Sequence, residues 1–516
     1  MGCLLGIDIG TSSAKVLLAT EAGEVVARAS AEYPITRPRT DWAEQDSEDW
    51  WRAVVAGLRK ALKAAPQCAS DIAGIGLSGQ MHGTLLLDDQ GAPLAPAVIW
   101  PDQRSARQVA EITSLVGRER LLELTGSPLA TGFQAATIRW VQQHDPDVWR
   151  RARWVVLPKD YIRYRLAGAF ATDPSDGSGT LLLDVRQRDW SDEVLDALEI
   201  DRRRLPPVQP SSCVAGSLSA EASEATGVPA GVPVVTGAAD TACSLLGAGV
   251  LAPASLLLTI STGGQVVLPA VAVAIDRAGR AHTFCSALAP GDGRAAWYEM
   301  AATLAAGLSL RWLRDVLGLA GVEGAYDQMV AWATAAPLGA GGLLYLPYLL
   351  GERTPHMDPL ASGMLLGLTA SHTRAHLVRA VLEGVVMGCW DAYTVLVELG
   401  AAPVEIVMAG GGARSRLWQQ IVADIFGLPV RPLLAADQST LGALVLAADG
   451  VGLGGAAFAA NAVAGRGAVV EPDAQHHAQY QELVALFRDQ YAKHRDDFRA
   501  LAALRSTGSP VSVAGE

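Results

Sequence analysis

The chain has 516 residues, a formal net charge of −12, 50% hydrophobic residues and 18% charged residues. This composition can bury a large core, which excludes intrinsic disorder, and the acidic balance argues against a general nucleic-acid binder. A prior of about 150 residues per domain predicts three domains or two large ones.

Apolar runs alternate with amphipathic segments along the chain, which predicts an α/β protein with parallel strand pairing. The predicted strands, in chain order, are 4–9, 72–77, 154–157, 232–236, 256–260, 343–346 and 405–408. The predicted helices are 47–64, 303–317, 372–399, 415–426 and 474–504. Residues 505–516 are rich in Ser, Gly and Pro, so we expect a disordered tail.

Residues 241–275 contain no charged side chain, and their length alone would admit a membrane span. Pro253, Pro269 and a Ser-Thr-Gly-Gly turn interrupt the segment, so we predict two short buried strands around a turn and no membrane contact. The N-terminus lacks a basic region and a cleavage site, which favours a cytoplasmic protein. The six cysteines form no CxxC pair, which argues against a disulfide scaffold or a zinc ribbon.

Two patterns recur in the same order in the two halves of the chain. Residues 4–18 and 255–268 both read as an apolar strand, a tight Gly/Ser/Thr turn and a second apolar strand. Residues 71–83 and 404–415 each read as a strand that runs into small residues. We predict two duplicated domains that meet near residues 245–254. The alternative is chance recurrence in a glycine-rich chain.

A first candidate site follows the strand 4–9, where Gly10–Ser13 form a turn whose N–H groups can bind an anion. Asp8 lies inside that apolar strand, and a buried carboxylate is costly unless it is paired or faces a metal. Mg²⁺ carried by ATP and contacted through water would suit it. The alternative is a carboxylate satisfied by the turn amides. Ser261–Gly264 form the matching turn of the second half, and the pair could clamp a triphosphate.

Asp240 follows the strand 232–236 and opens a predicted helix, so its carboxylate would lie at the end of the sheet where α/β proteins bind ligands. Helix capping by Asp240 is the alternative, and it is compatible with catalysis. Gly410–Gly412 join a strand to a helix and would let a flat ligand approach the backbone. The alternative there is an ordinary tight connection.

Taken together, these residues resemble the FGGY carbohydrate kinases, which share the actin/hexokinase-like (ribonuclease H-like) fold. The motif most similar to the xylulokinase branch of that family is Gly79-Gln80-Met81-His82-Gly83. The other matching motifs are Trp100-x-Asp102-x-Arg104, Pro158-Lys159-Asp160-Tyr161, Ser175-Asp176 with Gly179-Thr180, Pro347-Tyr348 with Gly351–His356, and Gly410–Ser415. The resemblance implies a sugar-binding domain at 1–245, a nucleotide-binding domain at 254–504 and an ATP cleft between them.

The resemblance also implies roles at matching positions. Asp240 would be the general base for the sugar hydroxyl, and Asp8 would position Mg²⁺ of Mg·ATP through water. The implied sugar-binding residues are Gln80, Met81, His82, Trp100, Asp102, Asp240 and Thr241. The implied ATP-binding residues are Thr11, Ser12, Lys15, Thr262, Gly263, Gly411, Gly412 and Arg414.

Three positions depart from the usual family pattern. Thr241 stands where Asn commonly follows the base, which leaves the identity of the sugar open. Ser261 stands where the second phosphate turn usually begins with Gly, and Gln438–Thr440 precede Leu-Gly-Ala in place of a Gly-Pro or Gly-Ala pair. These two departures concern the nucleotide side.

The resemblance therefore predicts an ATP- and Mg²⁺-dependent kinase that converts a ketopentose, D-xylulose first, to its 5-phosphate. The alternatives are a kinase for another pentulose, a polyol or a sugar acid, and a catalytically silent sugar-binding relative. The expected partners are a small sugar and ATP, with no nucleic acid and no membrane, and a homodimer is a further possibility.

Overall fold

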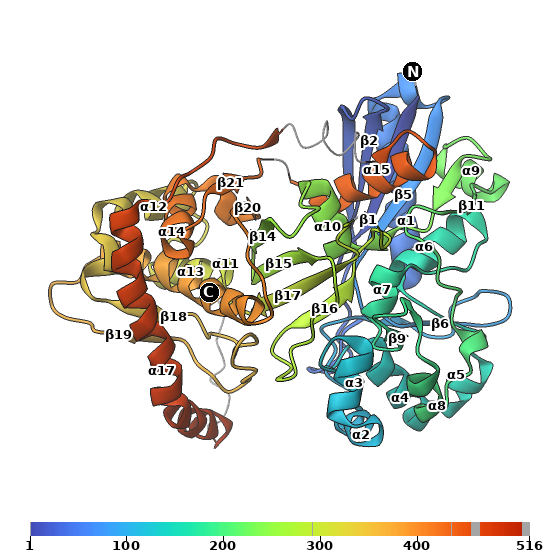
Figure 1. The fold of residues 1–516 in the computed structure, drawn as a ribbon. Helices are drawn as coiled ribbons and strands as arrows, with labels where there is room; N and C mark the ends of the chain where they lie inside the picture. The colour runs from blue at the N-terminus through green and yellow to red at the C-terminus, as the bar shows by residue number, and fades with distance from the viewer. Residues whose placement is uncertain (1, 292, 435, 456–464, 508–516) are drawn as a thin grey trace. The chain divides into compact units, whose positions relative to one another are not determined.

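A computed structural model describes residues 2–291, 293–434, 436–455 and 465–507 (Figure 1). The chain divides into two compact units. The first unit comprises residues 1–253, 269–299 and 435–465, and the second comprises 254–268, 300–434 and 466–516. Each unit is therefore assembled from three separate segments of the chain.

The first unit is built on a seven-stranded sheet of order β11-β12-β5-β1-β2-β3, in which β13 also pairs with β5. Its central strand β1 runs parallel to β5 and antiparallel to β2, and all seven residues of β1 are buried. The strands are β1 (Cys3–Ile9), β2 (Ser13–Thr20), β3 (Val25–Glu32), β5 (Ile72–Gly79), β11 (Val214–Ser217), β12 (Pro233–Val235) and β13 (Ala238–Ala239).

Helices and short strands surround this sheet. The helices are α1 (Ser47–Ala64), η1 (Pro66–Cys68), α2 (Ala106–Val116), α3 (Arg118–Thr125), α4 (Gln134–His144), α5 (Pro146–Arg151), α6 (Pro158–Ala167), α7 (Pro174–Ser178), α8 (Asp192–Ala197), η2 (Arg202–Arg204), α9 (Ala220–Thr226), α10 (Asp240–Ala248) and α15 (Gln438–Gly450). The short strands are β4 (Glu44–Gln45), β6 (Leu85–Leu87), β7 (Ala97–Val98), β8 (Trp154–Val156), β9 (Leu183–Asp184), β10 (Asp189–Trp190) and β16 (His282–Cys285).

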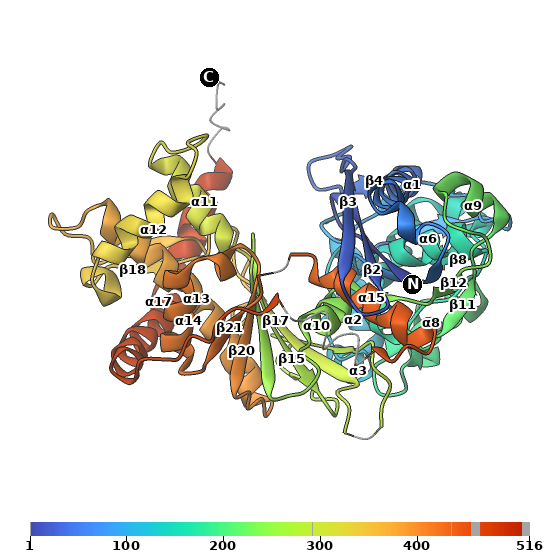
Figure 2. The ribbon, with the colours of Figure 1, turned by 90° about the horizontal axis from the view of Figure 1, so that it is seen from above.

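Helix α15 belongs to the first unit although it comes from the far end of the chain. It packs on β1, β5 and α10, and Figures 1 and 2 both show the orange helix beside the blue strands. Glycines permit this close packing: a Cβ added at Gly76 would lie 1.8 Å from the Ala443 carbonyl oxygen, and one at Gly442 would lie 1.9 Å from that of Cys243. The sequence-based division assigns residues 254–504, which include this helix, to the nucleotide-binding domain, and that division stays a prediction.

The sheet of the second unit contains β14 (Ser255–Ile260), β15 (Gly264–Ala270), β20 (Glu405–Ala409) and β21 (Val430–Pro432). Its full strand order is β16-β17-β15-β14-β20-β21, and β17 (Trp297–Thr303) runs from the first unit into the second. The other elements are α11 (Gly307–Val316), α12 (Ala325–Ala335), η3 (Leu338–Gly341), β18 (Leu344–Leu346), β19 (Met364–Leu366), α13 (Arg374–Glu398), η4 (Gly411–Arg414), α14 (Arg416–Phe426) and α17 (Ala474–Thr507).

The predicted duplication is confirmed in the sheet topology. In the first unit β1 pairs antiparallel with β2 and parallel with β5; in the second, β14 pairs antiparallel with β15 and parallel with β20. The fold is thus a mixed α/β arrangement with one mixed sheet per domain.

The predicted elements are confirmed except at some boundaries. The helix predicted over 303–317 begins at Gly307, because Thr303 still belongs to β17. The segment 241–275 does form two strands around a turn, but its first residues form α10. Of the predicted disordered tail, residues 505–507 complete α17 and residues 508–516 lie outside the described part of the chain.

Helix α13 is long and apolar enough to cross a membrane by length and composition alone. However, 78% of its apolar window is buried inside the structure, as expected for the core helix of a globular domain. It packs against α12, α14 and β18 of the second unit.

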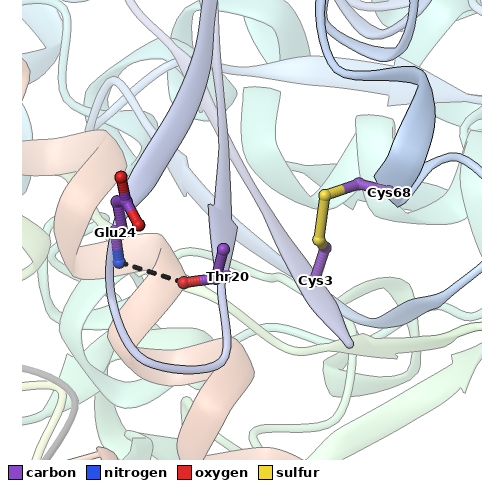
Figure 3. The surroundings of a disulfide bond; sticks show 4 residues. All are labelled: Cys3, Thr20, Glu24 and Cys68. Atoms are coloured by element: carbon purple, nitrogen blue, oxygen red, sulfur yellow. Dashed lines mark hydrogen bonds between the residues drawn. A yellow bond between two sulfur atoms is a disulfide. The ribbon is translucent and has the colours of Figure 1, made fainter. Parts of the chain in front are cut away.

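Cys3 and Cys68 form a disulfide that the sequence analysis did not foresee (Figure 3). The register explains their proximity, because Cys3 pairs with Ile72 at the start of β5 and η1 ends at Cys68 just before that strand. The prediction that the cysteines form no disulfide scaffold therefore needs this one correction, whereas Cys213, Cys243, Cys285 and Cys389 are free thiols.

Candidate active site

Asp8 lies near the carboxyl end of β1 and is 5% exposed. Ser78 Oγ donates to Asp8 Oδ1 at 2.8 Å, and Ser439 Oγ donates to Asp8 Oδ2 at 2.9 Å. Burial raises the pKa of Asp8, while the two hydroxyls and the Lys15 ammonium act in the opposite direction. The carboxylate is therefore held by side chains, not by the turn amides that the alternative interpretation invoked.

The strand register brings Asp240 to the same edge of the sheet. Ser78 of β5 pairs with Asp8 on one side and with Ala238 of β13 on the other. Asp240 follows β13 directly as the first residue of α10, and its carboxyl accepts a hydrogen bond from the Thr241 backbone N–H at the start of that helix. Parallel strands place their carboxyl ends together, and α/β sheets bind ligands there.

The carboxyl of Asp240 has an unusual protonation equilibrium. Burial, and then the negative charge of Asp8, raise its pKa to about 7. A general base works best when its pKa lies near the working pH, so this environment suits proton transfer. Thr241 Oγ1 donates to Asp240 Oδ1 at 3.2 Å. The Thr241 hydroxyl thus contacts the Asp240 carboxyl, a contact that the sequence does not reveal.

The Met81 and His82 side chains form the next part of the site. His82 adopts a positive φ of 72°. Its ring stacks on Phe133 at a centroid distance of 3.9 Å, and its Nδ1 lies 2.6 Å from the Gly179 carbonyl oxygen. The Tyr298 hydroxyl donates to the Met81 sulfur at 3.9 Å.

Tyr298 donates to Met81 and also interacts electrostatically with the proposed base. Burial raises the pKa of the Tyr298 hydroxyl, and the charge of Asp240 raises it further, so the two groups lie within electrostatic range. No sequence motif singled out Tyr298, which comes from β17. The sequence motifs did not identify Ser78 and Ser439 either, because the sequence does not show that their hydroxyl groups face a carboxylate.

A hydrogen-bonded series links Gln80 to Trp100, two of the remaining predicted sugar-binding residues. Gln80 Nε2 donates to Gln45 Oε1 at 2.9 Å, and Gln45 Nε2 donates to the Thr11 carbonyl oxygen at 2.7 Å. Trp100 Nε1 donates to Thr11 Oγ1 at 3.0 Å. Gln80 Oε1 is buried and has no hydrogen-bond partner among the described residues, so it is available as an acceptor.

Asp102 and Lys15 are engaged with protein groups. Asp102 is fully buried, and its Oδ2 accepts from the Ala43 N–H at 2.7 Å and from Arg104 Nη2 at 2.8 Å. It therefore organises the loop that carries Trp100. Lys15 Nζ lies 2.9 Å from Asp437 Oδ1, and Ser12 of the same hairpin is exposed.

The second unit contains a cavity of about 1030 Å³, a volume at the upper end of the range for ligand sites. Four of the predicted ATP-binding residues line it: Thr262, Gly411, Gly412 and Arg414. The helices α11, α12 and α14 contribute to its other walls, through residues that include Leu310, Arg311, Tyr326, Val330 and Trp418. Gly263 is not among the lining residues.

Local backbone geometry shapes this cavity. The Ser261 carbonyl accepts from the Gly307 N–H at 2.7 Å, so the turn after β14 is fastened to the start of α11. Gly410 has a φ of 82°, and a Cβ there would lie 2.4 Å from the Ile260 carbonyl oxygen. A Cβ at Gly411 would meet nothing within 4 Å, so this glycine leaves the cavity wall open.

Among the described residues, no group of three or more His, Cys, Asp or Glu side chains is placed to hold a metal ion. A single carboxylate flanked by hydroxyls, as at Asp8, suits an ion that retains most of its water and is carried by phosphates. The residues present thus fit Mg²⁺ delivered with a nucleotide better than a resident metal.

Comparison with known proteins identifies the family of the chain. Residues 3–247 match the FGGY family of carbohydrate kinases, N-terminal domain, and residues 271–450 match the C-terminal domain of that family. The xylulose kinase of Escherichia coli is 37% identical over 94% of this chain and 98% of its own length. The gluconokinase of Bacillus subtilis is 31% identical over 86% of each chain.

A solved structure supports the same assignment. The xylulose kinase from Rhodospirillum rubrum superposes with a TM-score of 0.88 at 32% identity and covers 96% of this chain and 100% of its own. The chain therefore belongs to the FGGY family of carbohydrate kinases, and it is xylulokinase-like.

Proposed function

We propose that the protein transfers the γ-phosphoryl group of ATP to D-xylulose and forms D-xylulose 5-phosphate and ADP. The observation that carries the proposal is Asp240, a partly buried carboxyl with a pKa of about 7 at the sheet edge that also presents Asp8. Similarity to xylulose kinases supports the choice of sugar.

In this mechanism the Asp240 carboxylate accepts the proton of the sugar 5-hydroxyl as that oxygen attacks the γ-phosphorus of ATP. The bond between the γ-phosphorus and the bridging oxygen breaks, and ADP leaves with the electron pair. Phosphoryl transfer depends mainly on positioning and charge stabilisation. Asp8 would hold the water shell of Mg²⁺, which offsets the phosphate charge when it is bound.

We assign sugar binding to the first domain and nucleotide binding to the second. In support, Met81, His82 and Asp240 belong to the first unit, and the cavity at Thr262 and Gly411 belongs to the second. Gln80, Trp100 and Thr11 would border the sugar and phosphate side, and Arg414 the nucleotide. A cytoplasmic location and a homodimer remain predictions, the second testable by light scattering.

A sugar-acid kinase is the second candidate, because a gluconokinase is among the relatives of similar identity. A panel of D-xylulose, D-ribulose, L-ribulose, xylitol and gluconate, assayed by sugar-dependent ADP release, separates the candidates. We expect the highest kcat/KM with D-xylulose. A preference for gluconate would replace the proposed substrate, and no ADP release with any sugar would indicate the silent relative.

A further inference from the structure

Two motifs of the sequence have no role in the mechanism above, Pro158–Tyr161 and Ser175–Thr180. In the first unit they meet around a buried ion cluster. The fully buried Lys159 Nζ lies 2.6 Å from Asp160 Oδ1, 3.4 Å from Asp173 Oδ1 and 3.6 Å from Asp176 Oδ2. Burying such charges is costly unless they are paired and hydrogen-bonded, so we expect the cluster to have a structural or functional role.

Asp173 connects this cluster to Ser175 through the two oxygens of its carboxylate. Its Oδ1 faces Lys159, and its Oδ2 accepts from the Ser175 N–H at 3.0 Å and from Ser211 Oγ at 2.8 Å. Asp173 Oδ2 also accepts the hydroxyl proton of Ser175. Because that proton is committed to Asp173, the lone pairs of Ser175 Oγ point away from it.

Those lone pairs accept the backbone N–H of Ala239 at 3.0 Å. Ala239 is fully buried and immediately precedes Asp240. The backbone here needs such support, because β13 has only two residues and follows Gly237, whose φ is 82°. A side chain thus fixes the N–H of the residue that precedes the proposed base.

We propose that Ser175 is a positioning residue for Asp240, and that Lys159 and Asp173 orient its hydroxyl for this task. The inference rests on the proposed role of Asp240 as general base. It gives a function to Lys159 of the first motif and to Ser175 of the second: they set the direction of the Asp240 carboxyl without touching the sugar.

The same helix offers a matched control. Ser178 is also fully buried, and its Oγ also accepts a backbone N–H, that of Cys285 at 3.1 Å. Ser175→Ala and Ser178→Ala therefore each remove one hydroxyl from α7 and leave one buried N–H unpaired, with comparable stability losses expected. The Ser178 hydroxyl also donates to the Ser175 carbonyl oxygen at 2.8 Å, but only Ser175 accepts the N–H of the residue that precedes Asp240.

The experiment measures kcat, KM for sugar and ATP, the pH profile of kcat/KM and Tm for both variants. We expect Ser175→Ala to lower kcat by about 10- to 100-fold, since small misplacements of a catalytic group have effects of this order. Its acidic limb should move to lower pH, because a carboxyl released from its buried position has a lower pKa. Ser178→Ala should lower Tm by a similar amount with kcat and the acidic limb unchanged.

If Ser175→Ala does not fold, Asp173→Asn replaces it, since an amide oxygen accepts the Ser175 hydroxyl more weakly than a carboxylate does. We then expect a smaller loss of kcat with the same shift of the acidic limb. Equal kcat and equal pH profiles in the Ser175 or Asp173 variant and in Ser178→Ala would overturn the inference.

Asp240→Asn distinguishes this failure from a failure of the proposed function. If Asp240→Asn retains full turnover, the base assignment falls and the inference falls with it. If Asp240→Asn is inactive while Ser175→Ala behaves like Ser178→Ala, only the positioning role is lost.

Discussion

Replacing Thr241 with valine removes the hydroxyl that donates to Asp240 Oδ1 at 3.2 Å and keeps a side chain of similar volume. This hydrogen bond favours the ionised carboxylate, and it acts against the burial and the Asp8 charge that raise the pKa of Asp240 to about 7. Without it the pKa should rise further, and less of the base should be ionised at neutral pH.

The magnitude follows from the strength of the contact. A hydrogen bond of this length to a carboxylate contributes about 1 kcal/mol, which corresponds to a pKa increase of about 0.7. Starting from a pKa of about 7, the ionised fraction at pH 6.5 falls by roughly fourfold, whereas at pH 9 it changes by less than about 10%.

The assay is the pH profile of kcat/KM with D-xylulose, measured by ADP release between pH 5.5 and 9. Thr241→Ser is the matched control, because it keeps the hydroxyl and loses only the methyl group, so its acidic limb should stay in place. An acidic limb that is the same in Thr241→Val as in the unmodified enzyme would refute the reasoning. Thr241→Asn, tested across the pentuloses, asks separately whether this position reaches the sugar.

Three further predictions concern other parts of the site. Asp8→Asn removes the charge that helps raise the pKa of Asp240, so the acidic limb of the pH profile should move to lower pH. In the same variant KM for Mg·ATP should rise more than KM for the sugar, and an unchanged Mg²⁺ dependence of the rate would count against the proposed role of Asp8 in positioning Mg²⁺. Gly411→Leu projects a side chain into the open wall of the cavity and should raise KM for ATP by more than about tenfold with KM for the sugar unchanged, which steady-state kinetics would show. Because the pKa of Asp240 is raised in the folded protein, its carboxyl ionises at lower pH in the unfolded chain than in the folded one, and the unmodified protein loses stability as pH rises from about 4 to 7. Asp240→Asn lacks this loss, so over that range it should become more stable than the unmodified protein by about 1–3 kcal/mol. Equal stability of the two proteins at pH 8 in urea unfolding would contradict the raised pKa.

Much of the fold could be predicted because its signals are local. Apolar runs located β1, β5, β14 and β20, and the repeated strand-turn-strand pattern predicted that both units pair these strands alike. The glycine run 410–412 was also visible in the sequence, and Gly411 and Gly412 line the cavity.

Contacts between distant segments could not be predicted in the same way. Ser439 lies 431 residues from Asp8, and nothing in the chain indicates that α15 packs on β1. The contacts of the Asp102 carboxylate with Arg104 and the Ala43 N–H were likewise not visible from its motif, and its predicted role in sugar binding stays a prediction. The Cys3–Cys68 pair depends on strand register, which spacing alone does not reveal.

The central claim is that this chain phosphorylates D-xylulose with Asp240 as the base. The most direct measurement is ³¹P NMR of the product formed from D-xylulose and ATP by the unmodified enzyme and by Asp240→Asn, with ATP binding measured in parallel. The account predicts a pentulose 5-phosphate formed in equal amount with ADP, and a loss of about 10²- to 10⁴-fold in kcat for Asp240→Asn with ATP binding retained. Near-full turnover by Asp240→Asn, or no sugar phosphate from the unmodified enzyme, would contradict it.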